Sequence, residues 1–224
     1  MSLIEWPAGE RPRERLLAQG VASLSDAELL AIVLVSGTRD SDVLALSRRC
    51  LATFGGLAGL LGASRERFCA IKGLGPARFA QLQAAREMTR RSLGEVLAHR
   101  PLFDSPVAVR DYLKLTIAAK AHEVFLALFL DAQHRLLAAE ELFRGTLAQT
   151  SVYPREVVKR ALEVNAAAVV FAHNHPSGLA EPSRADELLT AALRNALELV
   201  DIRTLDHFIV AGSRVYSFSE HGKL

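Results

Sequence analysis

The sequence predicts an α/β protein in which an all-α domain precedes a layered α/β domain. The first 92 or so residues are short apolar segments separated by Gly, Ser and Thr, with almost no alternation of period two. Beyond residue 101, buried-strand patterns alternate with helical patterns, as in layered α/β domains. The length of 224 residues accommodates both. We therefore expect domains at 1–92 and 102–224, joined by a linker at 93–101.

The helices of the first domain are predicted from their end signals. Ser25 is a typical N-cap, and Glu28 three residues later completes a capping box ahead of the apolar run 29–34. Pro76 opens the last helix, where its missing N–H costs nothing. Further helices are predicted over 42–54, closed by Gly55-Gly56, over 64–71 and over 76 to about 91.

The second domain begins after the linker, which contains Gly94 and Pro101. Its strands are short apolar runs, and 124–130 is continuously apolar, as expected of a strand covered on both faces. Helices are predicted over 106–120 after Asp104-Ser105, over 154–164 and over 183–200. Strands are predicted over 123–130, 136–143 ending at Gly145-Thr146, 166–172, 205–210 and 214–218.

Composition limits the function classes. Half of the residues are apolar and 23% are charged, which excludes a disordered or collagen-like chain. The longest apolar runs of about seven residues are far short of the roughly 20 that cross a bilayer. The N-terminus has no signal-peptide pattern, so we expect a cytoplasmic protein without a membrane partner. With only Cys50 and Cys69, a bound metal needs histidine and carboxylate ligands.

Two histidines follow the predicted strand 166–172. In extended chain, residues i and i+2 point the same way, so His173 and His175 can face one cation. Asp186 lies eleven residues beyond His175, in the first turn of the next predicted helix. Two imidazoles and one carboxylate leave a fourth tetrahedral position open, which is typical of catalytic rather than structural zinc.

A zinc-activated water also needs a base and a stabilised oxyanion. The adjacent Glu140 and Glu141 lie on a predicted strand, so only one of them can face the site. Ser183 can polarise the oxyanion from a helix N-terminus. Ser183 and Asp186 also have the pattern of a plain N-cap, and a histidine beside a strand is often only a hydrogen-bonded structural residue.

The spacing of His173, His175, Ser183 and Asp186 resembles the signature of JAMM (MPN-type) metalloproteases. The sequence also resembles the bacterial RadC family over nearly the whole chain. The motifs that carry this resemblance are Gly145-Thr146-Leu147, Pro154-Arg155-Glu156, the run 173–178 and Leu205-Asp206-His207-Phe208. The resemblance implies a cytidine-deaminase-like α/β sandwich and one zinc ion held by His173, His175 and Asp186. Glu140 best matches the general base, with Glu141 the fallback. His207 matches a family position, where we expect a structural hydrogen bond.

A glycine turn in the first domain resembles a helix-hairpin-helix, a DNA-binding module without sequence preference. Gly73 and Gly75 allow the backbone to approach a phosphate, helped by Lys72 and Arg78. Residues 1–100 carry a net charge of +4 and the remainder −2, although solvated helix surface accounts equally well for so mild an asymmetry. A plain helical turn or a protein contact is the alternative. Affinity of the turn alone would be in the nonspecific range of roughly 10⁻⁴ to 10⁻⁶ M.

The leading hypothesis is a zinc-dependent peptidase or isopeptidase of JAMM type, acting on an unidentified protein or peptide. Glu140 would accept a proton from the attacking water, and zinc and Ser183 would stabilise the oxyanion. The alternative is a DNA-associated protein of repair or recombination that uses the glycine turn, with the second domain as scaffold or accessory hydrolase. The sequence indicates neither the substrate nor the oligomeric state.

Overall fold

The computed structural model describes residues 6–38, 40–102, 106–144 and 152–224. The chain divides into two compact units, Met1–Met88 and Thr89–Leu224. The boundary falls within one helix, α6 (Pro76–His99). Across the described ranges, no helix combines the length and apolar character that crossing a membrane requires.

Unit 1 is built from short helices, as the sequence predicts. Ser25 caps α2 (Asp26–Leu34) in a full capping box with Glu28, and Gly55 ends α3 (Val43–Phe54) in the left-handed conformation. Their apolar sides form one core with Leu60, Phe68 and Leu74. The other elements of this unit are η2 (Ala8–Glu10), α1 (Pro12–Gln19), η3 (Val21–Ser23), α4 (Leu57–Leu61), α5 (Arg65–Cys69) and the start of α6.

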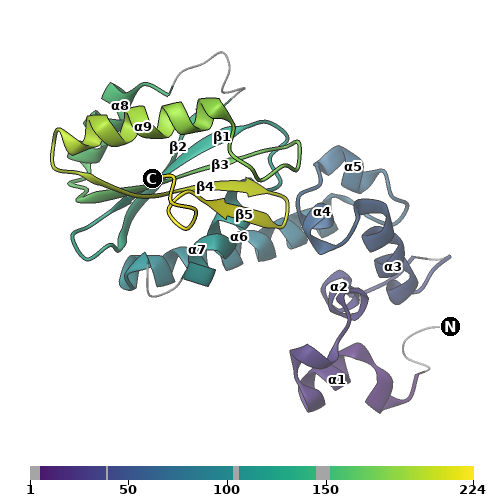
Figure 1. The fold of residues 1–224 in the computed structure, drawn as a ribbon. Helices are drawn as coiled ribbons and strands as arrows, with labels where there is room; N and C mark the ends of the chain where they lie inside the picture. Colours follow the sequence, from purple (N-terminus) through teal and green to yellow (C-terminus); the bar gives the residue numbers. More distant parts are fainter. Residues whose placement is uncertain (1–5, 39, 103–105, 145–151) are drawn as a thin grey trace. The chain divides into compact units, whose positions relative to one another are not determined.

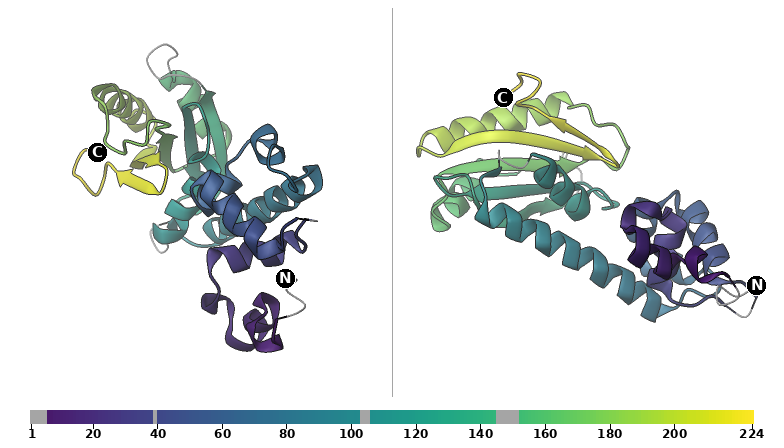
Figure 2. Two further views of the ribbon diagram at one scale, coloured as in Figure 1. Left: turned by 90° about the vertical axis from the view of Figure 1, so that its right-hand side faces the viewer. Right: turned by 90° about the horizontal axis from the view of Figure 1, so that it is seen from below.

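The predicted end of α6 near Arg91 is wrong, because the helix continues through most of the expected linker to His99 (Figure 2). Leu97 explains the extension, since its side chain is fully buried in the core of unit 2. Gly94 is accommodated inside the helix. Tertiary packing thus outweighs the local glycine signal.

Unit 2 is a mixed α/β domain with a sheet in the order β2-β1-β3-β4-β5. Strands β3 and β4 are parallel, and the other neighbouring pairs are antiparallel. The strands are β1 (Val124–Leu130), β2 (Leu136–Arg144), β3 (Ala168–Asn174), β4 (Arg203–Ala211) and β5 (Arg214–Ser217). Every residue of β1 and β3 is buried, as the continuous apolar pattern predicts.

Helices cover both faces of this sheet (Figure 1). One face packs against α8 (Pro154–Glu163) and α9 (Arg184–Glu198), around Phe125, Phe129 and Phe171. The other packs against α7 (Pro106–Ile117) and the end of α6, through alternate strand residues such as Leu126 and Leu128. The predicted α/β layering of this unit is therefore confirmed.

Most predicted boundaries agree within two or three residues. The strand predicted to end at Ala172 instead extends to Asn174, so His173 lies within β3 rather than after it. The expected helix start at Asp104-Ser105 and the strand end at Gly145-Thr146 lie outside the described residues, as does Leu147.

Candidate metal centre

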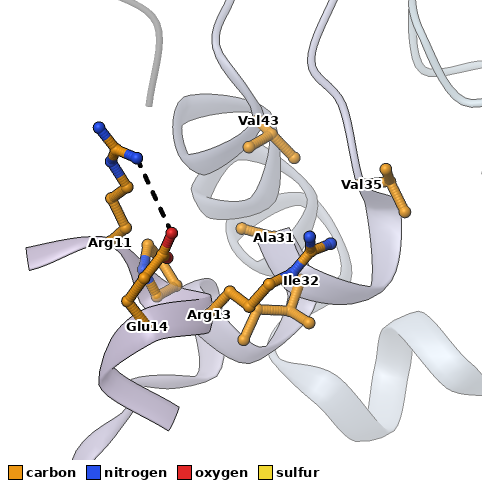
Figure 3. Close-up of a pocket in the computed structure, with 8 residues that line it drawn as sticks. Arg11, Arg13, Glu14, Ala31, Ile32, Val35 and Val43 are labelled. Atoms are coloured by element: carbon orange, nitrogen blue, oxygen red, sulfur yellow. Dashed lines mark ion pairs between the residues drawn. The ribbon is translucent and has the colours of Figure 1, made fainter. Parts of the chain in front are cut away.

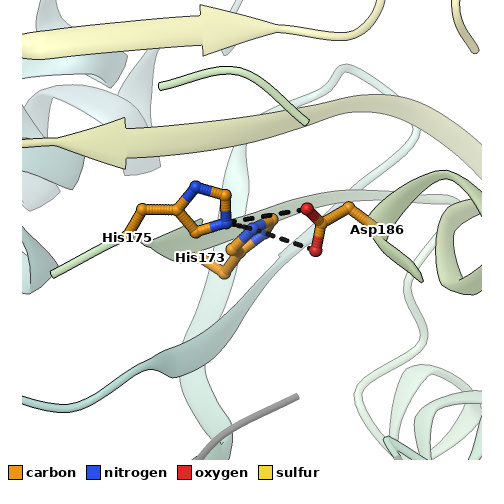
Figure 4. Close-up of side chains that lie close together, drawn as sticks. All are labelled: His173, His175 and Asp186. Carbon is orange, nitrogen blue, oxygen red and sulfur yellow. Dashed lines mark hydrogen bonds and ion pairs between the residues drawn. The ribbon is translucent and has the colours of Figure 1, made fainter. Parts of the chain in front are cut away.

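Two neighbouring elements bring the three predicted ligands together (Figure 4). His173 lies on β3 and His175 directly follows it, so their side chains point the same way. Asp186 is in the first turn of α9, whose N-cap is Ser183. The potential ligand atoms of His173, His175 and Asp186 all lie within 4.8 Å of one another. The predicted ligand set is thus spatially compact.

The distances place the potential metal-binding atoms of the three residues around a common point. His173 Nε2 and His175 Nε2 are 2.9 Å apart. Asp186 Oδ1 lies 3.3 Å from His173 Nε2, and Asp186 Oδ2 lies 3.6 Å from His175 Nε2. His173 and Asp186 are almost completely buried, whereas the side chain of His175 is 12% exposed. A ligand would therefore reach the group from the side of His175.

One oxygen in this group has no hydrogen-bond partner among the described residues. Asp186 Oδ1 is buried and has no hydrogen bond to any residue that the structure describes. A buried carboxylate oxygen without a partner is costly, and a cation bound beside it would remove that cost. The two imidazoles and the carboxylate also match the donor set of open zinc sites. These residues therefore fit the metal that the sequence pattern implies.

The electrostatics favour neutral His173 and ionised Asp186. Burial lowers the pKa of His173 to about 4, although Asp186 opposes the shift. Burial alone would raise the pKa of Asp186, but hydrogen bonds from His175 and Ser183 and the interaction with His173 lower it overall. The neighbouring carboxylate of Asp186 raises the pKa of His175 against the effect of burial. Ionised carboxylate and neutral imidazole are the metal-binding forms.

His207 makes the buried hydrogen bonds that the sequence analysis expects of it. Its Nε2 lies 2.8 Å from His173 Nδ1, and its Nδ1 lies 2.6 Å from Thr190 Oγ1. The other ligand histidine is held differently, since His175 Nδ1 lies 2.8 Å from the carbonyl oxygen of Leu179. Both rings thus have a hydrogen-bond partner on the side away from Asp186.

Ser183 serves as a helix cap and holds the carboxylate of Asp186. Its Oγ donates to Asp186 Oδ2 at 2.7 Å, and the backbone N–H of Ser183 donates to the same oxygen at 2.7 Å. Its Oγ in turn accepts from the backbone N–H of Asp186. The capping interpretation of Ser183 is confirmed, and its predicted contact with an oxyanion stays a prediction.

Glu140 and Glu141 point to opposite faces of the sheet, as predicted for adjacent strand residues. Glu140 accepts two hydrogen bonds from Arg160 Nε of α8, at 2.9 and 3.0 Å, and this contact lowers its pKa. Glu141 pairs with Lys120. Glu140 is on the face of His173 but opposite Ala127, which pairs with Phe171, two residues before His173. Neither glutamate belongs to the compact ligand group.

Glu123 is the acidic residue that sequence reasoning missed. Antiparallel β1 and β3 pair Phe125 with His173, and continuing that register by two residues sets Glu123 opposite His175. Because alternate residues share a face, Glu123 lies on the face of the ligands. Its charge contributes to the raised pKa of His175. The only sign of this in the sequence is an acidic residue just before a continuous apolar strand. Its proximity to the histidines becomes evident only once β1 is known to pair with β3.

The glycine turn of unit 1 is engaged in local packing. Gly73 has a φ of +96°, and a Cβ there would lie 2.1 Å from Thr38 Cγ2. Arg78 donates to the carbonyl oxygens of Gly73, Ser36 and Gly37. Lys72 pairs with Asp40 at 2.5 Å, on the surface. The turn thus has a structural role, and its predicted contact with DNA stays a prediction.

Unit 1 also has a hollow, whose lining includes none of the residues of this turn (Figure 3). Arg11 and Glu14 form an ion pair of 3.8 Å across part of it. Its lining combines charged and apolar side chains and contains no histidine or cysteine: Arg11, Pro12, Arg13, Glu14, Ala31, Ile32, Val35 and Val43. This lining does not resemble a zinc site.

Comparisons with known proteins cover both parts of the chain. Residues 103–223 match the family model described as the RadC-like JAB domain, and residues 3–80 match the UPF0758 N-terminal model. A UPF0758 protein of Methylibium petroleiphilum is 62% identical over 220 residues, covering 98% of this chain and 99% of that protein. A second, of Leptothrix cholodnii, is 60% identical with the same coverage. A third, of Dechloromonas aromatica, is 59% identical over the full length of both chains.

Proposed function

The chain belongs to the UPF0758 family and carries a RadC-like JAB domain, and from this premise we propose that it is a zinc-dependent hydrolase of peptide or isopeptide bonds. The substrate is proposed to be a protein or peptide. His173, His175 and Asp186 would hold the ion. When bound there, zinc activates water for attack on a carbonyl group near neutral pH.

The observation that carries this proposal is the unsatisfied Asp186 Oδ1 facing His173 Nε2 in a buried site. A helix cap alone does not require this arrangement, because Ser183 uses only Oδ2. Nor does a structural histidine pair. The Nε2 atoms of His173 and His175, 2.9 Å apart, bond to each other only if one of them carries a proton, and neutral His175 directs its proton from Nδ1 to the carbonyl oxygen of Leu179. A shared cation satisfies all three atoms.

We assign the general base to Glu123 rather than Glu140. The extrapolated register supports Glu123, and so does its electrostatic interaction with the partly exposed His175. Glu140 is bound by Arg160, which stabilises its ionised form and lowers its pKa. A base must collect a proton from water and return it to the leaving amine, and the contact with Arg160 opposes protonation. Ser183 would hold Asp186, and could reach an oxyanion only by turning away from Oδ2.

Metal content tests the ligand assignment. Protein purified without a metal-affinity column is analysed by mass spectrometry after equilibration with zinc. We expect about one equivalent in the wild type, and a loss of most of it in His175→Ala and Asp186→Asn, because each removes one of three ligands. Less than about 0.1 equivalent in the wild type would contradict the proposal.

Hydrolysis tests the base. Pools of internally quenched peptides and of isopeptide-linked peptides are incubated with wild type, Glu123→Gln and Glu140→Gln, all loaded with zinc. We expect Glu123→Gln to keep zinc and to lose about 10²–10⁴-fold in rate, and Glu140→Gln to keep most of the activity. The reverse ranking would assign the base to Glu140. The inactive variant that retains zinc is then the bait for capturing natural substrates.

Contact with DNA through the glycine turn is the second candidate, favoured by the side chain of Lys72, which is 82% exposed. Fluorescence titration at 50 mM salt against duplex, forked and single-stranded DNA tests it. Gly75→Ala and Lys72→Gln are suitable variants. A Cβ at Gly75 meets no atom within 4 Å, and the side chain of Lys72 is exposed, so neither substitution should disturb the fold. Absence of binding by the wild type, or equal binding by all three proteins, would remove this candidate.

A further inference from the structure

We propose that Thr190 and His207 are positioning residues that fix the tautomer of His173, so that its Nε2 lone pair faces the metal site. This inference rests on the proposed metal function. Thr190 lies on α9 and His207 on β4, and both side chains are buried, His207 completely. Neither side chain is within the ligand group, so they would act on zinc only through His173.

The backbone carbonyl group of Asp186 determines which atoms donate and which accept in this chain of hydrogen bonds. Thr190 Oγ1 lies 2.6 Å from the carbonyl oxygen of Asp186 and 2.6 Å from His207 Nδ1. The carbonyl oxygen can only accept, so the single hydroxyl proton of Thr190 goes to Asp186. The hydroxyl oxygen is then the acceptor for His207, whose Nδ1 must carry a proton.

This assignment propagates to the ligand. A neutral imidazole has one N–H and one lone pair, and the side chain of His207 is fully buried, where a charged ring is disfavoured. With its proton on Nδ1, His207 Nε2 accepts, and the atom 2.8 Å away is His173 Nδ1. His173 Nδ1 therefore donates, which leaves its Nε2 without a proton and directed at Asp186.

The anchor at Thr190 is needed because a histidine by itself specifies no direction. Either nitrogen of His207 can carry the proton, and the opposite choice would place a proton on His173 Nε2, where it blocks metal binding. His175 has no such ambiguity, since its Nδ1 faces the carbonyl oxygen of Leu179, which can only accept. A backbone carbonyl oxygen thus determines the tautomer of each histidine. For His175 the carbonyl acts directly, and for His173 it acts through the side chains of Thr190 and His207.

Aromatic packing keeps His207 in this position. Phe218 stacks on its ring at 4.8 Å with an interplanar angle of 18°, and Phe125 and Phe171 meet it edge-on at 5.4 and 6.1 Å. All three phenylalanines are fully buried. These rings enclose His207 and favour the orientation that makes the two contacts to His173 and Thr190.

The tautomers can be observed in metal-free protein by two-bond ¹H–¹⁵N correlation of the histidine rings near pH 7.5. We expect wild type to show the proton of both His173 and His207 on Nδ1. Thr190→Val removes the acceptor with little change of volume, so we expect His173 to carry its proton on Nε2 in part or all of the molecules. Thr190→Ser should restore the wild-type pattern. A wild-type His173 with its proton on Nε2 would overturn the proposal without any variant.

The effect of the tautomer of His173 on zinc binding is measured as the Kd for zinc, by competition with a chelating dye. We expect Thr190→Val to weaken the Kd by about 10–100-fold, the usual effect of losing a partner behind a metal-ligating histidine, and Thr190→Ser to lie near wild type. The matched control is Thr116→Val on α7, which removes a similar hydroxyl bond to a backbone carbonyl, 2.6 Å long, far from the ligands in sequence.

The outcomes separate this inference from the proposed function. If wild type shows the stated tautomers but binds no zinc, the metal proposal fails and the positioning of His173 stands. If wild type binds zinc and Thr190→Val matches it in both tautomer and Kd, the positioning role is wrong. An equal loss of affinity in Thr116→Val would also overturn it, because the effect would then be a general loss of stability.

Discussion

At the scale of single residues, the ion pair of Glu140 with Arg160 predicts a pH-dependent contribution to stability. Arg160 lowers the pKa of Glu140, so the stabilisation is present above the ordinary carboxyl pKa and is lost as the pH falls through the lowered value. We expect Glu140→Gln to lower the free energy of unfolding by about 0.5–1 kcal/mol at pH 7, with the difference shrinking towards pH 3. Urea unfolding measures it.

Glu163→Gln is the control for this pair, because Glu163 contacts the same guanidinium at 3.0 Å from a more exposed position. It should cost less than Glu140→Gln at pH 7. A deficit of Glu140→Gln that persists unchanged from pH 7 to pH 3 would show that the interaction with Arg160 is not its cause.

The compact group of candidate metal ligands was predictable from sequence and the proposed base was not, for a physical reason. His173, His175 and Asp186 are close along the chain, and alternation within a strand plus one helix start suffices to bring them together. Glu123 is 50 residues before His173. It reaches the site only through the antiparallel register of β1 and β3, which no local pattern of residues specifies.

The glycine turn supports a second prediction at this scale. Gly73 has a φ of +96°, and a Cβ added there would lie 2.1 Å from Thr38 Cγ2, whereas a Cβ at Gly75 would meet no atom within 4 Å. We expect Gly73→Ala to destabilise unit 1 by more than about 1 kcal/mol, from the left-handed backbone and the clash. Gly75→Ala should stay within about 0.5 kcal/mol of wild type. Thermal melting of the two variants compares them, and equal melting temperatures would contradict this account of the turn.

At the scale of elements, the extension of β3 shows what local patterns omit. The apolar run ends at Ala172, and yet Asn174 remains in the strand. Its side chain accepts from the backbone N–H of Val124 and donates to the carbonyl oxygens of Lys120 and His122. Partners from a distant segment thus carry the strand past its apolar run. The same bonds hold the segment that contains Glu123 beside His175.

The length of α6 leads to a prediction for Gly94. A Cβ at this position would meet Tyr112 Cε2 at 3.6 Å, an ordinary van der Waals contact. Glycine within a helix costs about 0.5–1 kcal/mol relative to alanine, so Gly94→Ala should stabilise the protein by about that amount. Chemical denaturation measures the gain. If residues 93–101 formed a flexible linker in solution, the substitution would leave the unfolding curve unchanged.

At the scale of the whole molecule, zinc should affect the stability of the two units differently. Unit 1 has its own apolar core, and the ligands all belong to unit 2. A ligand stabilises only the cooperative unit whose folded form binds it. Unfolding in calorimetry should therefore show two transitions, of which zinc raises only one.

The size of that shift follows from mass action. Zinc at about 100 times its Kd stabilises the binding unit by about 2.7 kcal/mol, which for a domain of this size raises the melting temperature by on the order of 10 °C. His175→Ala should abolish the shift and leave the other transition in place. A single transition that moves with zinc would mean that α6 couples the units into one cooperative structure, since this helix belongs to both cores through Leu82 and Leu97. Two transitions that both move would contradict a single metal site in unit 2.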